Sequence, residues 1–125
     1  MAEKIPTPTP NLAQSLPPPA LDRHRAEIGI TVEAILDGYW KSRPAEVVRQ
    51  RIMKDWMDEL QDWTIAQVEA ALIEWRNRNP DKKPNPGHIK LVLMKFRGEA
   101  WAYGMHPAFN PKLDSQNATA LLAAQ

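Results

Sequence analysis

The chain contains no cysteine, which excludes a disulfide framework and any site that depends on a thiolate. It has no run of about 18 consecutive apolar residues and no basic segment followed by an apolar one at its start. We therefore expect neither a membrane span nor a signal peptide. The net charge is only +1 at pH 7, so an electrostatic role needs a local patch of charge. These absences favour a cytoplasmic protein that does not bind a membrane.

Residue types that carry catalysis are few and scattered. The histidines are His24, His88 and His106, and the serines are Ser15, Ser42 and Ser115. No two histidines have the helical spacing of a metal site, and no serine has a plausible partner for a catalytic triad. The five glycines are too dispersed to form a phosphate-binding loop. We predict a protein that is not an enzyme and that holds neither a metal nor another cofactor.

Proline, in contrast, is abundant, and half of the twelve prolines lie within residues 1–20. Few large apolar side chains accompany them, so burial cannot offset the entropy lost on ordering this segment. We predict that residues 1–20 form a disordered, Pro-rich arm. Residues 105–125 are polar and then alanine-rich, and we expect a flexible tail there. The folded domain would then span residues 21–104.

Apolar residues within this domain recur at helical spacing, and no segment alternates with the period of a strand. The spacing predicts a first helix over about residues 21–40. A second helix should begin near Pro44, since proline suits a first turn. Its inward residues would be Val48, Ile52, Met53, Trp56 and Leu60. The fold class that follows is all-α, a small helical bundle of about four helices.

The third and fourth helices have recognisable starts. Thr64 and Gln67 have the spacing of a capping box, so the third helix should begin directly after Thr64. Asn85 followed by Pro86 predicts the start of the fourth helix, which would end at Gly104. The tryptophans that fall on buried stripes of these predicted helices, and that we expect in the core, are Trp56, Trp63 and Trp75.

Charge is segregated along the second half of the domain. Residues 55–74 contain six acidic and no basic residues, whereas residues 75–97 contain seven basic residues and one acidic residue. The simplest interpretation is a set of solvated polar faces, partly arranged as the helix dipoles favour. Lys82 and Lys83, however, adjoin the start of the fourth helix, where amides and dipole already favour an anion. Lys90 and Arg97 would share one outer stripe of that helix.

These residues predict a surface that binds either DNA phosphates, without reading sequence, or an acidic protein. The candidate residues are Arg76, Arg78, Lys82, Lys83, His88, Lys90, Arg97 and Trp101. Two of them have an alternative role. His88 lies in the first turn of the fourth helix and could cap it, and Trp101 could cover a neighbouring loop.

The segment DWTIAQVEAALIEWRNRNPDKKPNPGHIKLVL, together with the tryptophan-bearing helix before it, resembles a module of bacteriophage replication proteins. This is the small helical module of helicase loaders and loader inhibitors, and the likeness covers about residues 39–97. The matching positions are Trp56, Leu60, Val68, Ala71, Leu72, Trp75, Pro84, Pro86 and Ile89. The resemblance implies a non-enzymatic accessory protein of phage or prophage DNA replication in the host cytoplasm. It would bind a replicative helicase, another replication protein, DNA, or both protein and DNA.

Two other functions are compatible with the same sequence. A phage host-takeover or defence-inhibiting protein would mimic or block nucleic acid through the acidic run, whose candidate residues are Asp55, Asp58, Glu59 and Asp62. A structural subunit would instead associate with itself through Leu91 and Met94, the outer apolar residues of the fourth helix.

Overall fold

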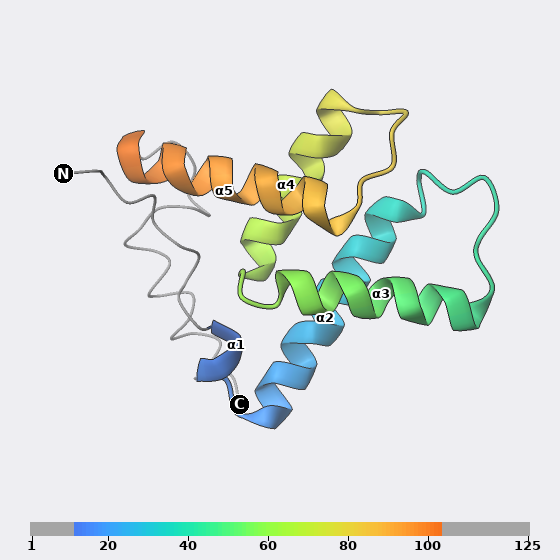
Figure 1. The fold of residues 1–125 in the computed structure, drawn as a ribbon, viewed down its shortest axis with the longest axis horizontal. Helices are drawn as coiled ribbons and strands as arrows, with labels where there is room; N and C mark the ends of the chain where they lie inside the picture. The colour runs from blue at the N-terminus through green and yellow to red at the C-terminus, as the bar shows by residue number, and fades with distance from the viewer. Residues whose placement is uncertain (1–11, 104–125) are drawn as a thin grey trace.

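The computed structural model describes residues 12–103, and their side chains through residue 98. Its helices are α1 (Leu12–Ser15), α2 (Pro18–Leu36), α3 (Glu46–Leu60), α4 (Ile65–Arg78) and α5 (Pro86–Tyr103) (Figure 1). The part of the chain that the structure describes contains no strand. The prediction of an all-α bundle is confirmed, and α1 is a short helix in addition to the four that were expected.

The beginning of the fold differs from the prediction. Residues 12–20, assigned to the disordered arm, contain α1 and the first turn of α2. They are ordered because Leu12, Leu16 and Ala20 bury together in a small apolar cluster. The backbone N–H of Ala13 also donates to the carboxylate of Asp62 at 3.0 Å. The predicted arm is thus corrected for these residues, whereas residues 1–11 and 104–125 lie outside the described part.

The four long helices enclose one core. Helix α2 contacts α3 and α4, and α5 contacts α4 and α3. The buried apolar residues are Ile28, Val32, Leu36, Met53, Trp56, Leu60, Trp63, Val68, Ala71, Leu72, Ile89 and Leu93. Helix α3 buries residues only from Met53 onward. Val48 was predicted to face inward, but it is 48% exposed because it lies in the first part of α3, before the residues that the helix buries.

The connection between α3 and α4 is fixed by local hydrogen bonds, as the sequence predicted. The Gln67 N–H donates to the Thr64 hydroxyl at 3.2 Å, and the Gln67 side-chain oxygen accepts from the Thr64 N–H at 2.9 Å. Both residues are buried, so this capping box also satisfies polar groups in the core. The prediction of the start of α4 is confirmed.

A buried histidine joins α2 to the same connection. The Nε2 atom of His24 lies 3.0 Å from the carbonyl oxygen of Gln61. Because a carbonyl oxygen can only accept, Nε2 carries the proton and donates. Burial lowers the pKa of His24 from its ordinary 6.5, although hydrogen bonds to backbone groups oppose this effect. The ring is therefore neutral at pH 7 and acts as a structural link.

Candidate partner-binding surface

The α4–α5 connection, residues 79–85, contains Lys82 and Lys83, and the other predicted surface residues lie on the two helices that it joins. Its first residue is held from two sides. The Asn79 N–H donates to the Trp75 carbonyl at 2.7 Å, and the Asn79 carbonyl accepts from the Tyr39 hydroxyl at 2.9 Å. Burial raises the pKa of the Tyr39 hydroxyl, so this donor stays protonated. Tyr39 thereby fixes the end of α4 to the end of α2.

Trp75 supports the middle of this connection. Its indole N–H donates to the Lys82 carbonyl at 2.8 Å, and the Lys82 ammonium lies 5.8 Å from the ring centroid. The ring also stacks on His88, with centroids 4.5 Å apart and planes 15° apart. Trp75 was predicted as a core residue, but it is half-buried and packs against the core with only part of its surface. The remaining surface holds the connection in place.

The end of the connection is a second reciprocal cap. The His88 N–H donates to the Asn85 side-chain oxygen at 2.9 Å, and the Asn85 N–H donates to the Nδ1 atom of His88 at 3.1 Å. This arrangement gives α5 the start that Asn85 and Pro86 predicted. Of its two predicted roles, His88 therefore has the capping role. Together with Trp75 it is part of the support of the connection.

Three of the predicted basic residues are engaged within the fold. Arg78 forms an ion pair with Glu74, and the Lys90 ammonium lies 3.5 Å from the Glu59 carboxylate. Arg97 was predicted to be outward-facing but is only 3% exposed. Its guanidinium lies 4.9 Å from the ring centroid of Trp63. Lys90 and Arg97 thus each have a partner within the fold: Lys90 faces the carboxylate of Glu59, and Arg97 faces the ring of Trp63.

The other three basic candidates, Arg76, Lys82 and Lys83, are exposed, and we call them the connection cations. None of them forms an ion pair with another residue in the described part of the chain. Lys82 and Lys83 have different surroundings. Lys82 lies over Trp75, whereas Lys83 lines a pocket. Arg76 and Asp81 both act electrostatically on the Tyr39 hydroxyl.

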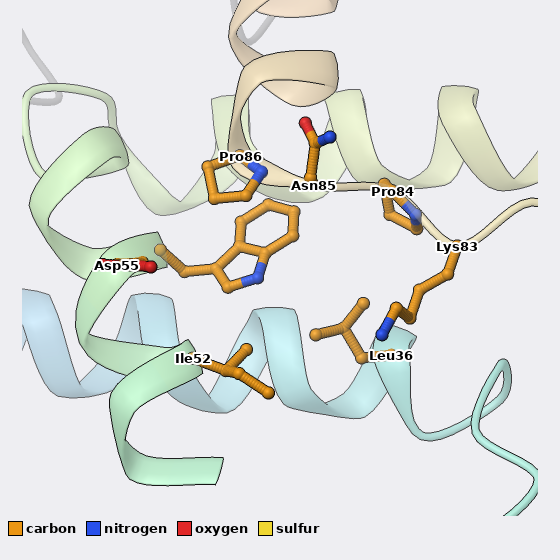
Figure 2. A pocket seen from close by; sticks show the side chains of 8 residues that line it. Leu36, Ile52, Asp55, Lys83, Pro84, Asn85 and Pro86 are labelled. Carbon is orange, nitrogen blue, oxygen red and sulfur yellow. The ribbon is translucent and has the colours of Figure 1, made fainter. Parts of the chain in front are cut away.

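This pocket has a volume of about 210 Å³ and lies between α3 and the α4–α5 connection (Figure 2). Its lining residues are Leu36, Ile52, Asp55, Trp56, Lys83, Pro84, Asn85 and Pro86. The Lys83 side chain extends from the connection with its ammonium group near Leu36, and Asp55 lies on the other side. Sequence analysis missed this pocket because its two charged residues belong to separate segments whose proximity depends on the tertiary fold. Tyr39 was also missed as a support, for the same reason.

The alternative acidic surface is largely occupied by internal contacts. Asp58 accepts from Arg25 at 2.8 Å and from Lys54 at 2.7 Å, and both hydrogen bonds lower the pKa of its carboxyl. Glu59 faces Lys90, and Asp62 accepts from the backbone of Ala13. Of the four acidic candidates, Asp55 alone forms no ion pair or hydrogen bond with a described residue. The geometry therefore does not favour a nucleic-acid mimic built on these four carboxylates.

The remaining candidates are exposed or lie beyond the described side chains. Leu91 is 72% exposed and Met94 is 39% exposed, as the self-association alternative requires. The side chain of Trp101 lies outside the described residues. Within the described range there is no group of three or more histidine and acidic residues placed to hold a metal ion.

Comparisons with protein-family models, with curated proteins and with solved structures give no match. None of the helices within the described range has the length and apolar character needed to cross a membrane. The features that bear on function are therefore the α4–α5 connection with Lys82 and Lys83, Arg76 near the end of α4, which is unpaired among the described residues, and the pocket beside the connection.

Proposed function

We propose that this chain is a non-enzymatic accessory protein of phage or prophage DNA replication. It binds a replication protein, such as the replicative helicase, through the α4–α5 connection. The observation that carries this proposal is the set of connection cations, which no described carboxylate neutralises. The resemblance of about residues 39–97 to the helical module of helicase loaders and loader inhibitors supports the same class of function.

The support beneath the connection favours a binding role. Trp75, Tyr39 and the Asn85–His88 cap together fix the backbone on both sides of Lys82 and Lys83. A loop that is already ordered loses less conformational entropy when a partner binds, so more of the interaction energy remains as affinity. Charges at the rim of such a surface mainly accelerate association and select partners of opposite charge.

The mixed charge around the connection favours an acidic protein over DNA. Only three of the candidate cations are free of ion pairs with described residues, and Lys82 lies over Trp75 whereas Lys83 lines the pocket. Asp55 lies in the same pocket as Lys83, and Asp81 lies in the connection itself. A phosphate backbone is uniformly negative and would be repelled by both carboxylates. A protein surface can place a cation opposite each of them.

A pull-down with matched charge reversals tests this function. We expect the full chain to capture a replication protein from a bacterial host lysate, identified by mass spectrometry. The Lys82→Glu/Lys83→Glu variant should lose roughly tenfold or more of this binding, since each reversed rim charge costs on the order of 1 kcal/mol. Arg23→Glu/Arg51→Glu is the control, because it reverses two exposed cations of α2 and α3.

Two results would reject this proposal. One is capture of the same replication protein by both variants at equal strength. The other is retention of labelled DNA at low salt, lost in the Lys82→Glu/Lys83→Glu variant, without capture of a replication protein. In that case the connection cations bind phosphates, and retention should fall steeply as salt is raised.

A further inference from the structure

The pocket between α3 and the α4–α5 connection combines an apolar lining with two opposite charges. We propose that it binds a short peptide segment of the protein partner. In that segment an apolar side chain enters the pocket. An acidic residue of the peptide on one side of it pairs with Lys83, and a basic residue of the peptide on the other side pairs with Asp55. This inference rests on the proposed function in one respect, namely that the partner is a protein.

The size and lining of the pocket select the kind of group that enters it. A volume of about 210 Å³ is below the roughly 300–1,000 Å³ of sites for cofactors and drug-sized ligands. It is sufficient for one large side chain. Leu36 and Trp56, which are almost fully buried, form part of the lining, and Pro84 and Pro86 border it from the connection. An apolar side chain of the partner would therefore be removed from water on several sides.

The two charges define what must flank that side chain. Neither Asp55 nor Lys83 forms an ion pair with the other or with any further residue among those described. Figure 2 shows them at opposite sides of the pocket, Asp55 on α3 and Lys83 on the connection. A ligand of a single charge would be attracted by one and repelled by the other. A segment that carries both charges, one on each side of an apolar residue, complements the whole pocket.

The pocket is held open by contacts that are independent of its charges. The Lys82 carbonyl, directly before Lys83, accepts from the Trp75 indole, and the Asn85 side chain is used in the cap of α5. Pro84 restricts the backbone between these two contacts, and Pro86 restricts it directly after Asn85. Asp55 is on a regular helix, next to the buried Trp56. The site is thus formed before the ligand arrives, which favours binding of a flexible peptide.

A selection from a surface-displayed library of short random peptides, with the full chain as bait, tests this inference. We expect the enriched peptides to carry an acidic and a basic residue on either side of a large apolar residue. For a synthetic peptide of the enriched sequence, Asp55→Asn and Lys83→Met should each weaken binding about fivefold, which corresponds to the loss of one exposed ion pair. The bound peptide should also shift the indole NMR signal of Trp56.

Matched variants separate the pocket from its surroundings. Lys82→Met makes the same chemical change one residue away, but its ammonium lies over Trp75 outside the pocket. Asp22→Asn removes an exposed carboxylate on α2. Both should bind the selected peptide within about twofold of the unaltered chain, because neither residue lines the pocket.

The outcomes also separate this inference from the proposed function. Two results would overturn the pocket as a peptide site. One is a set of enriched peptides without the two charges, and the other is binding by Asp55→Asn and Lys83→Met that is as strong as binding by the unaltered chain. If the pocket fails this test but the unaltered chain captures a replication protein that the Lys82→Glu/Lys83→Glu variant does not, the proposed function would stand without the pocket. A selected peptide that depends on Asp55 and Lys83, without capture of any replication protein, would instead reject the proposed function alone.

Discussion

The two longer connections of this fold differ in how their basic residues are paired. They are residues 37–45, between α2 and α3, and residues 79–85, between α4 and α5. In the first, Arg43 lies 2.6 Å from Glu33 and 3.7 Å from Asp37. Arg49, just beyond it on α3, pairs with Glu33 at 2.8 Å and with Glu46 at 2.7 Å. In the second, Lys82 and Lys83 have no such partner among the described residues. Both connections contain proline and positive charge, but only the first has a cation that pairs with carboxylates, namely Arg43. Lys41, also in the first connection, is exposed and forms no ion pair with a described residue.

The difference indicates what holds each connection. Residues 37–45 are flanked by a network of ion pairs centred on Glu33, which faces both arginines. They also share one uncharged contact with the second connection, the hydrogen bond from the Tyr39 hydroxyl to Asn79. Residues 79–85 depend on uncharged contacts: the indole of Trp75, the hydroxyl of Tyr39 and the cap between Asn85 and His88. A connection that is ordered without ion pairs leaves its cations available to the carboxylates of a partner. The contrast therefore leads directly to experiments that remove one kind of support at a time.

The largest effect is expected at Trp75. Trp75→Ala removes the stack on His88, the hydrogen bond to the Lys82 carbonyl and part of the core contact. We expect a loss of about 3 kcal/mol in the free energy of unfolding, at the low end for a large aromatic because Trp75 is half-buried. Denaturant unfolding measures this loss.

Trp75→Phe is the matched control, because it keeps a stacked ring and removes the indole N–H. It should cost on the order of 1 kcal/mol, the value of one hydrogen bond. If Trp75→Ala cost no more than Trp75→Phe, the ring would not support the connection, and the contrast between the two connections would fail.

A smaller effect is expected when the ion-pair network is broken. Glu33→Gln leaves Arg43 without its closest carboxylate and Arg49 with Glu46 alone. We expect a loss of about 1 kcal/mol, reduced at high salt, since these charges are partly exposed. Lys82→Gln/Lys83→Gln should change stability by less than about 0.5 kcal/mol, because no described carboxylate loses a partner.

Thermal unfolding at low and high salt compares these variants. Glu27→Gln serves as a control on α2, since its exposed carboxylate forms no ion pair with a described residue. Equal losses from Glu33→Gln and Lys82→Gln/Lys83→Gln would mean that both connections depend on charge to the same extent.

The sequence was informative wherever a structure depends on residues close together in the chain. Thr64 with Gln67, and Asn85 with Pro86, indicated two helix starts because a cap is formed within a single turn. Leu12, Leu16 and Ala20 also have helical spacing, which could have revealed the ordered part of the predicted arm. The prolines around them outweighed that signal.

The residues that sequence analysis misplaced depend on neighbours from other elements. Arg97 is buried because Trp63, from the α3–α4 connection, offers it an aromatic face. Val48 is exposed because it lies in the first turn of α3, which buries no residue, although its spacing is that of a core residue. Asp55 and Lys83 come together only through the packing of α3 against the α4–α5 connection. None of these contacts can be read from a local sequence pattern. The cap and the basic residues of the candidate site could therefore be predicted, whereas the pocket and the burial of Arg97 could not.

The smallest effect concerns the titration of Glu46, the first residue of α3, directly after the first connection. Hydrogen bonds from Arg49 and Gln50 lower the pKa of Glu46 from 4.5 to about 2. A carboxyl whose pKa is lower in the folded than in the unfolded chain stabilises the fold fully above pH 4.5. This contribution is lost as the pH falls through about 2. The carboxyl carbon of Glu46, followed by NMR, should accordingly titrate near pH 2, and at a higher pH in Arg49→Met, where the hydrogen bond from Gln50 still lowers the pKa. Titration near 4.5 in the unaltered chain would mean that Arg49 does not hold Glu46. The ion pairs beside the first connection would then be weaker than their geometry indicates. The first connection would accordingly differ less from residues 79–85.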